Sequence, residues 1–128
     1  MRVFYIGIFG LLGVFSRYFM GLAVGRALAP PFPYATFAIN IAGAFLIGVV
    51  YVLGIERNGI PLDVRIGIMV GFLGGFTTFS SYCLEFARLI EEGEYWYAAL
   101  YFGFSNVAGV LATFAGLVVA RFLFRATT

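Results

Sequence analysis

The sequence predicts an all-α integral membrane protein in which four transmembrane helices form a single domain over residues 1–128. Two observations support this prediction. Hydrophobic residues make up 62% of the chain and charged residues only 11%, and the mean hydropathy is +1.01, so the composition lies far from that of soluble domains. In addition, four apolar stretches each reach the length of roughly 20 residues that a helix needs to cross a bilayer.

The first two predicted helices are separated by prolines. The first covers about residues 3–28 and ends before Pro30 and Pro33, because proline interrupts a helix. The second covers about residues 34–55, and a polar turn at residues 56–59 closes it.

The last two helices are separated by an acidic turn. The third covers about residues 66–90, the acidic turn occupies residues 91–94, and the fourth helix covers about residues 95–124. Since the connections are short, neighbouring helices should run antiparallel.

Glycines repeat at a spacing of four in two of these helices. Gly67, Gly71 and Gly75 follow this spacing in the third helix, and Gly21 and Gly25 follow it in the first. Small residues at this spacing let membrane helices approach closely. We therefore expect tight packing along both faces.

The composition also excludes several functions. Cys83 is the only cysteine and histidine is absent, so the chain has no intrachain disulfide and lacks the commonest metal ligand and proton shuttle. The basic residues are all arginines and are scattered, which does not predict a nucleic-acid surface. Enzymatic activity is not expected.

The arginines encode the orientation in the membrane only weakly. The face with the termini holds five of them and the opposite face two, and this excess favours termini on the inside. Two of the five lie at the C-terminal end of the chain and orient the first helices little, so insertion in both orientations stays open. The two sets are Arg2, Arg57, Arg65, Arg121 and Arg125, and Arg26 and Arg88.

Two charged residues lie within apolar spans. Arg17 is inside the first helix, where a charge costs several kcal/mol unless it reaches the interface, pairs, or faces water. It either extends to the interface or forms an electropositive vestibule for anions. Glu85 in the third helix is a candidate counter-charge for Arg17.

Polar side chains also interrupt the second and fourth helices. Asn40 either bonds across helices or offers its amide hydrogens to a dehydrated anion, which needs donors. In the fourth helix, Tyr101 and Ser105 are four residues apart and Asn106 is adjacent. These residues either line a pathway or pack against lipid and other helices.

The segment at residues 71–82 contains the densest signal. The pair Gly74 and Gly75 is followed by the pair Thr77 and Thr78, and this should weaken or break the third helix in the middle of the membrane. Freed carbonyl oxygens are tolerated there only in protein or beside a cavity, and they suit a small cation such as Na⁺. The alternative is a plain kink filled by serine and threonine hydroxyls.

Two rows of side chains follow the predicted break. Phe79 and Tyr82 are three residues apart and share a helix face, while Thr77, Ser81 and Glu85 follow one another at a spacing of four. The positive edges of aromatic rings can contact an anion without a formal charge. The third helix thus combines an aromatic edge with a row of polar groups.

Three stretches of the sequence closely resemble the Fluc (CrcB) family of fluoride channels. They are residues 13–18 (GVFSRY), residues 36–43 (TFAINIAG) and, most specifically, residues 71–81 (GFLGGFTTFSS). The resemblance covers essentially the whole chain. It implies a multi-pass protein of the cell inner membrane that assembles as an antiparallel, dual-topology homodimer and exports fluoride passively through two pores.

The resemblance also implies roles for individual residues. The pore would use Phe79, Asn40, Tyr101 and Ser105, and a structural Na⁺ at the dimer interface would be held by main-chain carbonyls of Gly74 and Thr77 from each subunit. The predicted anion-binding set is Asn40, Thr78, Phe79, Ser80, Ser81, Tyr82, Tyr101 and Ser105, with Arg17 and Glu85 in the vestibule. The chain departs from the family pattern at Tyr82 and Cys83, where a phenylalanine and a serine are usual.

Two other classes of protein fit the sequence less well than a fluoride channel does. A proton-coupled antiporter of the small multidrug-resistance type also has four helices, but it needs a carboxylate within the membrane, and the first acidic residue here is Glu56, after the first two spans. A scaffold subunit without transport activity would gain nothing from a broken, polar third helix.

Overall fold

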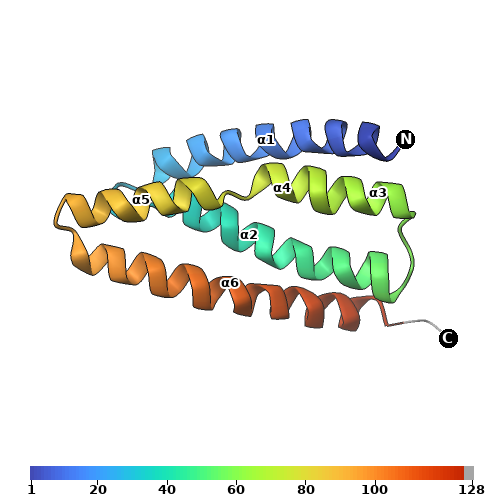
Figure 1. Cartoon of the computed structure of the whole chain (residues 1–128). Coiled ribbons are helices and arrows are strands. Elements are labelled where there is room, and N and C mark those ends of the chain that lie inside the picture. Colours follow the sequence, from blue (N-terminus) through green and yellow to red (C-terminus); the bar gives the residue numbers. More distant parts are fainter. Residues whose placement is uncertain (126–128) are drawn as a thin grey trace.

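The structure is a computed structural model that describes residues 1–125, and this part of the chain consists of helices and short connections (Figure 1). Four helical stretches are long and apolar enough to cross a membrane, which confirms the predicted number. They are Arg2–Ala27, Tyr34–Glu56, Leu62–Glu91 and Tyr95–Leu123. The last residues of the predicted domain, 126–128, lie outside the described part.

The first and last stretches are single helices, α1 (Arg2–Ala27) and α6 (Tyr95–Leu123). The second consists of α2 (Tyr34–Tyr51) and a π-helical turn, η1 (Val52–Glu56). Their bounds agree with the predicted ones to within one residue at each end, because prolines and the acidic turn mark them clearly.

The third stretch is assembled from several pieces. It contains α3 (Leu62–Ile66), a π-helical segment η2 (Gly67–Phe72), α4 (Leu73–Phe76) and, after an interruption, α5 (Phe79–Glu91). It begins four residues before the predicted start at residue 66, directly after Pro61, whose carbonyl oxygen accepts a hydrogen bond from the amide of Arg65 at 2.9 Å.

Neighbouring stretches run antiparallel, and the start of α1 and the end of α6 lie at one end of the molecule (Figure 1). Ion pairs at that end join Arg2 to Asp63 and Arg121 to Glu56. At the other end, Arg88 pairs with Glu92 within one helix. These three arginines thus lie at the ends that the sequence predicted for them.

Close helix packing was expected at the glycines of the third stretch, and their contacts with α1 confirm it. A Cβ added at Gly71 would lie 2.5 Å from the carbonyl oxygen of Ile6, and one at Gly75 would lie 2.8 Å from that of Gly10. A Cβ at Gly67 would also meet α1, 2.7 Å from the ring of Phe9.

Close helix packing was also expected at Gly21 and Gly25, and within this chain that prediction was wrong. A Cβ at Gly25 would meet nothing within 4 Å, and one at Gly21 would only touch Ile39 at 3.9 Å. The reason is the position of the helix crossing, since η2 and α4 contact α1 near Gly10 and Gly13 instead.

Thr77 and Thr78 separate α4 from α5 with extended backbone. Their φ and ψ angles are −81° and 157° for Thr77, and −147° and 116° for Thr78. The helix continues through Gly74 and Gly75 and ends at Phe76. The interruption therefore falls at the threonines and not at the glycines.

Threonine hydroxyls stabilise both sides of this interruption. Thr77 donates to the carbonyl oxygen of Leu73 through its amide (3.0 Å) and through its hydroxyl (2.8 Å). The Thr78 hydroxyl oxygen accepts a hydrogen bond from the amide of Ser81 at 3.2 Å and so caps the N-terminus of α5. The hydroxyl contacts expected for a plain kink are therefore present.

Candidate functional site

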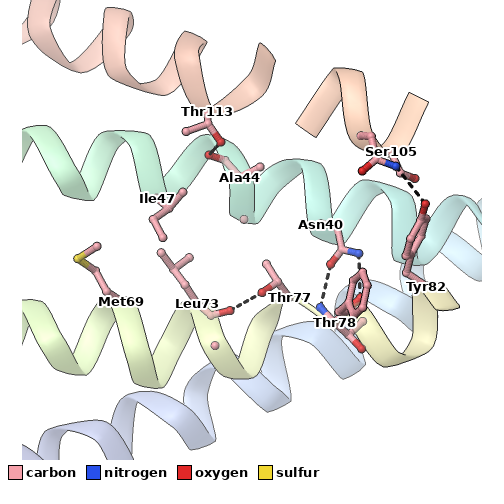
Figure 2. A pocket seen from close by; sticks show the side chains of 14 residues that line it. Asn40, Ala44, Ile47, Met69, Leu73, Thr77, Thr78, Tyr82, Ser105 and Thr113 are labelled. Atoms are coloured by element: carbon pink, nitrogen blue, oxygen red, sulfur yellow. Dashed lines mark hydrogen bonds between the residues drawn. The ribbon is translucent and has the colours of Figure 1, made fainter. Parts of the chain in front are cut away.

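A pocket of about 470 Å³ lies between α2, α4, α5 and α6, with Met69 of η2 at one side (Figure 2). It brings together residues of the anion pathway and of the cation site that the sequence predicted. These residues are Asn40, Gly74, Thr77, Thr78, Phe79, Tyr82 and Ser105. None of the residues that line this pocket carries a charge.

Asn40 of α2 pairs with the extended backbone of Thr78. The amide of Thr78 donates to Asn40 Oδ1 at 2.8 Å, and Asn40 Nδ2 donates to the carbonyl oxygen of Thr78 at 3.0 Å (Figure 2). The side chain thus satisfies the backbone that the interruption exposes, as the structural interpretation required. Since Nδ2 carries two hydrogens and Thr78 accepts one, a second amide hydrogen remains at the edge of the pocket.

This pairing changes the partners of two carbonyl groups. In a continuous helix, the amide of Thr78 would donate to the carbonyl of Gly74, and the amide of Ser81 to that of Thr77. Here these amides donate to Asn40 Oδ1 and to the Thr78 hydroxyl oxygen. The interruption therefore releases the carbonyls of Gly74 and Thr77 from helical hydrogen bonds beside the pocket.

Aromatic side chains of α5 form one side of the pocket. Phe79 is 76% exposed, and its ring lies 5.8 Å from that of Tyr82 between centroids. Tyr82 also packs edge to face against Tyr101, with centroids 5.1 Å apart. Its hydroxyl oxygen accepts a hydrogen bond from Asn106 Nδ2 at 3.2 Å.

Tyr101 lies outside this pocket. Its side chain is fully buried in a cluster with Leu89 and Ala98, and its hydroxyl donates to Glu85 Oε2 at 2.8 Å. The other carboxylate oxygen, Oε1, accepts from the hydroxyl of Thr36 at 2.6 Å. The structure therefore places Tyr101 in a polar cluster with Glu85 and Thr36.

Arg17 lines a second pocket, of about 400 Å³, together with Thr36, Thr78 and Ser81. Arg17 and Glu85 form no ion pair in the described part of the chain, where the ion pairs are those at the two ends. Thr78 also lines the pocket that contains Asn40, so this residue of the interruption borders both cavities.

The two remaining predicted residues, Ser80 and Glu85, do not line the pocket that contains Asn40. Ser80 is exposed, and its hydroxyl lies 3.5 Å from that of Thr78. Glu85 lines a third cavity, of about 600 Å³, at the end of the molecule opposite the termini, together with Thr36, Arg88 and Glu92.

The sequence did not identify the hydrogen-bond partners of three polar residues near the site. Thr36 donates to Glu85, and Asn106 donates to Tyr82. Thr113 donates to the carbonyl of Ala44 at 2.9 Å (Figure 2). A polar residue within an apolar span was the available signal for each of them. The helix rotation that determines their partners is not visible in one sequence.

Comparison with known proteins agrees with the resemblance seen in the sequence. The family model for "CrcB-like protein, Camphor Resistance (CrcB)" matches residues 4–117. A relative from Chlorobium luteolum is 42% identical, with 94% of this chain and 93% of the relative covered. Relatives from Geotalea uraniireducens (41% identical; 94% and 98% covered) and Pseudomonas syringae pv. tomato (42%; 91% and 94%) are similar.

All three relatives carry the name fluoride-specific ion channel FluC, and ion channels are not enzymes. The family match covers most of the chain, and the relatives are matched over nearly their whole length. This chain is therefore a member of the CrcB family of fluoride ion channels.

Proposed function

We propose that this protein is a fluoride-selective channel that exports fluoride passively from the cytoplasm. The observation that supports it best is the uncharged pocket, which combines the amide of Asn40 and the hydroxyls of Tyr82 and Ser105 with the exposed ring of Phe79. Such a pocket offers hydrogen-bond donors and positive ring edges, and both suit an anion.

The chemistry of the pocket suits fluoride in particular. A small, strongly hydrated ion needs several donors to replace its water, and the second amide hydrogen of Asn40 and the hydroxyl of Ser105 are available. The hydroxyl oxygen of Ser105 is buried and has no hydrogen-bond partner in the described chain. Because no arginine lines the pocket, the ion is not trapped, as conduction requires.

The smaller pocket beside Arg17 serves as the entry to this path. A guanidinium in a partly exposed position raises the local concentration of anions. Ser81 and Thr78 line the same cavity, and Thr78 also lines the pocket that contains Asn40. Thr36, at the entry, donates a hydrogen bond to Glu85, which Tyr101 also binds.

We also propose an antiparallel homodimer in the cell inner membrane, with two pores and one structural Na⁺ at its centre. The exposed ring of Phe79 and the released carbonyls of Gly74 and Thr77 support this proposal. A second copy of the chain would cover the ring and supply further carbonyl ligands to the cation. The modest excess of arginine at the end with the termini allows both orientations.

The decisive test is fluoride efflux from liposomes that contain the purified protein, with chloride efflux as the comparison. We expect rapid release of fluoride without a proton gradient and little release of chloride. Equal release of both ions, or release of fluoride only when a proton gradient is imposed, would contradict the proposal. The second result would favour a coupled transporter of the antiporter type.

A further inference from the structure

A hydrogen bond between two helices fixes the hydroxyl of Tyr82. Asn106 of α6 donates from Nδ2 to Tyr82 Oη of α5 at 3.2 Å. The same nitrogen donates to the carbonyl oxygen of Phe102, one turn earlier in α6, at 2.8 Å. Since an amide nitrogen carries two hydrogens, these bonds use both of them. Asn106 therefore has no amide hydrogen left to offer to an ion.

Tyr82 keeps its own proton as a donor. Its hydroxyl accepts the bond from Asn106, and within residues 1–125 it donates to no other group. A hydroxyl that accepts one hydrogen bond is polarised into a stronger donor. The ring is also held from two sides, by Phe79 with centroids 5.8 Å apart and by Tyr101 with centroids 5.1 Å apart.

The surroundings of this hydroxyl are rich in donors. Tyr82, Asn106 and Ser105 line the same pocket. The Ser105 hydroxyl oxygen is buried without a hydrogen-bond partner in the described chain, and Asn40 retains one amide hydrogen after bonding to Thr78. A cavity whose free groups are donors provides the chemistry that recognises a small anion.

We propose that Asn106 is a positioning residue for the permeating anion. By holding Tyr82 Oη as an acceptor, it directs the hydroxyl proton of Tyr82 into the pocket, where this proton and the free donors of Asn40 and Ser105 bind the ion together. The inference rests on the proposed function and deepens it, because it assigns part of the anion affinity to a pair of residues on different helices.

A double-mutant cycle tests this inference in the liposome efflux assay. Asn106→Leu and Tyr82→Phe are made singly and together, and the fluoride concentration that gives half of the maximal efflux rate is measured for each variant. In the native background, we expect Asn106→Leu to raise this concentration by about threefold or more, within the range of coupling between contacting residues. In the Tyr82→Phe background, where the hydroxyl is gone, the same change should alter it by less than about 1.5-fold.

Controls separate this inference from the proposed function and from misfolding. Val107→Leu places the same side chain at an exposed neighbouring position and should leave efflux unchanged. If Asn106→Leu does not purify as a native assembly, Asn106→Asp replaces it. A carboxylate at this position would accept the proton of Tyr82, so Asn106→Asp should raise the half-maximal fluoride concentration more in the native background than in the Tyr82→Phe background. Charge repulsion of the ion alone would act equally in both backgrounds.

Equal fold-changes in both backgrounds, or no change in either, would overturn the role of Asn106 while fluoride efflux by the native protein still supports the channel. Absence of fluoride efflux from the native protein would instead refute the proposed function. A larger effect of Asn106→Leu when Tyr82 is present supports the inference.

Discussion

Substitution of Asn40 by aspartate tests the centre of the site, because it keeps the size of the side chain and changes only its hydrogen-bond donors and charge. Asn40 Nδ2 donates to the Thr78 carbonyl at 3.0 Å, while Oδ1 accepts from the Thr78 amide at 2.8 Å. A carboxylate keeps the second bond and loses the first, and it also loses the amide hydrogen that remains for the anion.

The expected loss of fluoride flux can be estimated from these two changes. One hydrogen bond to a charged group contributes about 1.5–3 kcal/mol, and a carboxylate about 4 Å from the ion repels it by about 4 kcal/mol at an effective dielectric constant of about 20. Since about 1.4 kcal/mol corresponds to a factor of ten, Asn40→Asp should lower the efflux rate by at least about 100-fold.

The assay is fluoride efflux from liposomes at matched amounts of protein, with assembly checked by size-exclusion chromatography. Asn58→Asp is the matched control, because Asn58 lies in the exposed turn before Pro61, far along the chain from the pocket. The estimated repulsion does not allow a well-assembled Asn40→Asp protein to keep about half or more of the native flux. Such a result would show that Asn40 has a purely structural role.

Four further predictions follow from the geometry. Tyr82→Phe should preserve selectivity for fluoride over chloride and change throughput at most several-fold, whereas Phe79→Ile, which removes the positive ring edge, should impair efflux far more; the reverse order would show that the aromatic lining is assigned wrongly. Thr77→Ser should leave Na⁺ dependence intact because the ligand is main-chain, while replacement of Na⁺ by a large organic cation should impair function, and full activity in that cation alone would contradict the site. Gly71→Ala should destabilise the protein by about 1–3 kcal/mol through overpacking, since its Cβ would lie 2.5 Å from a main-chain oxygen. The control is Gly103→Ala, whose Cβ meets nothing within 4 Å. After heating, a smaller fraction of the Gly71→Ala protein than of the control should elute as the native assembly. A single cysteine in one loop, in a variant without the native cysteine, should be labelled from both sides of intact cells, and labelling from one side only would exclude dual topology.

The helices were predictable because the sequence marks them with strong local signals. Apolar length determines the spans, and Pro30, Pro33 and the acidic turn at residues 91–94 determine where they end. Close packing at Gly71 was predictable from a local signal too, since glycines at a spacing of four share one helix face, but its partner helix α1 was not. The empty surroundings of Gly25 show that spacing alone does not identify the neighbouring helix.

The candidate site was predictable as a set of residues but not as a set of contacts. The polar residues stand out in an apolar background, and the pocket between α2, α4, α5 and α6 brings Asn40, Thr78 and Ser105 together. The bond from Tyr101 to Glu85 joins residues on different helices, and it depends on the rotation of α5 relative to α6. No local pattern encodes that rotation. The pairing of Asn40 with the amide of Thr78 likewise joins two different helical stretches, and no local pattern encodes it.

The interruption at Thr77 and Thr78 also sets the direction of the local electric field. The helical stretch from Leu62 to Phe76 ends there with its carbonyl groups, and α5 begins there with its amide groups. The peptide dipoles of the two pieces therefore place partial negative and partial positive charge within two residues of each other. One short extended segment can thus favour a cation on one side and an anion on the other, each by about 0.3–1 kcal/mol, through main-chain groups alone.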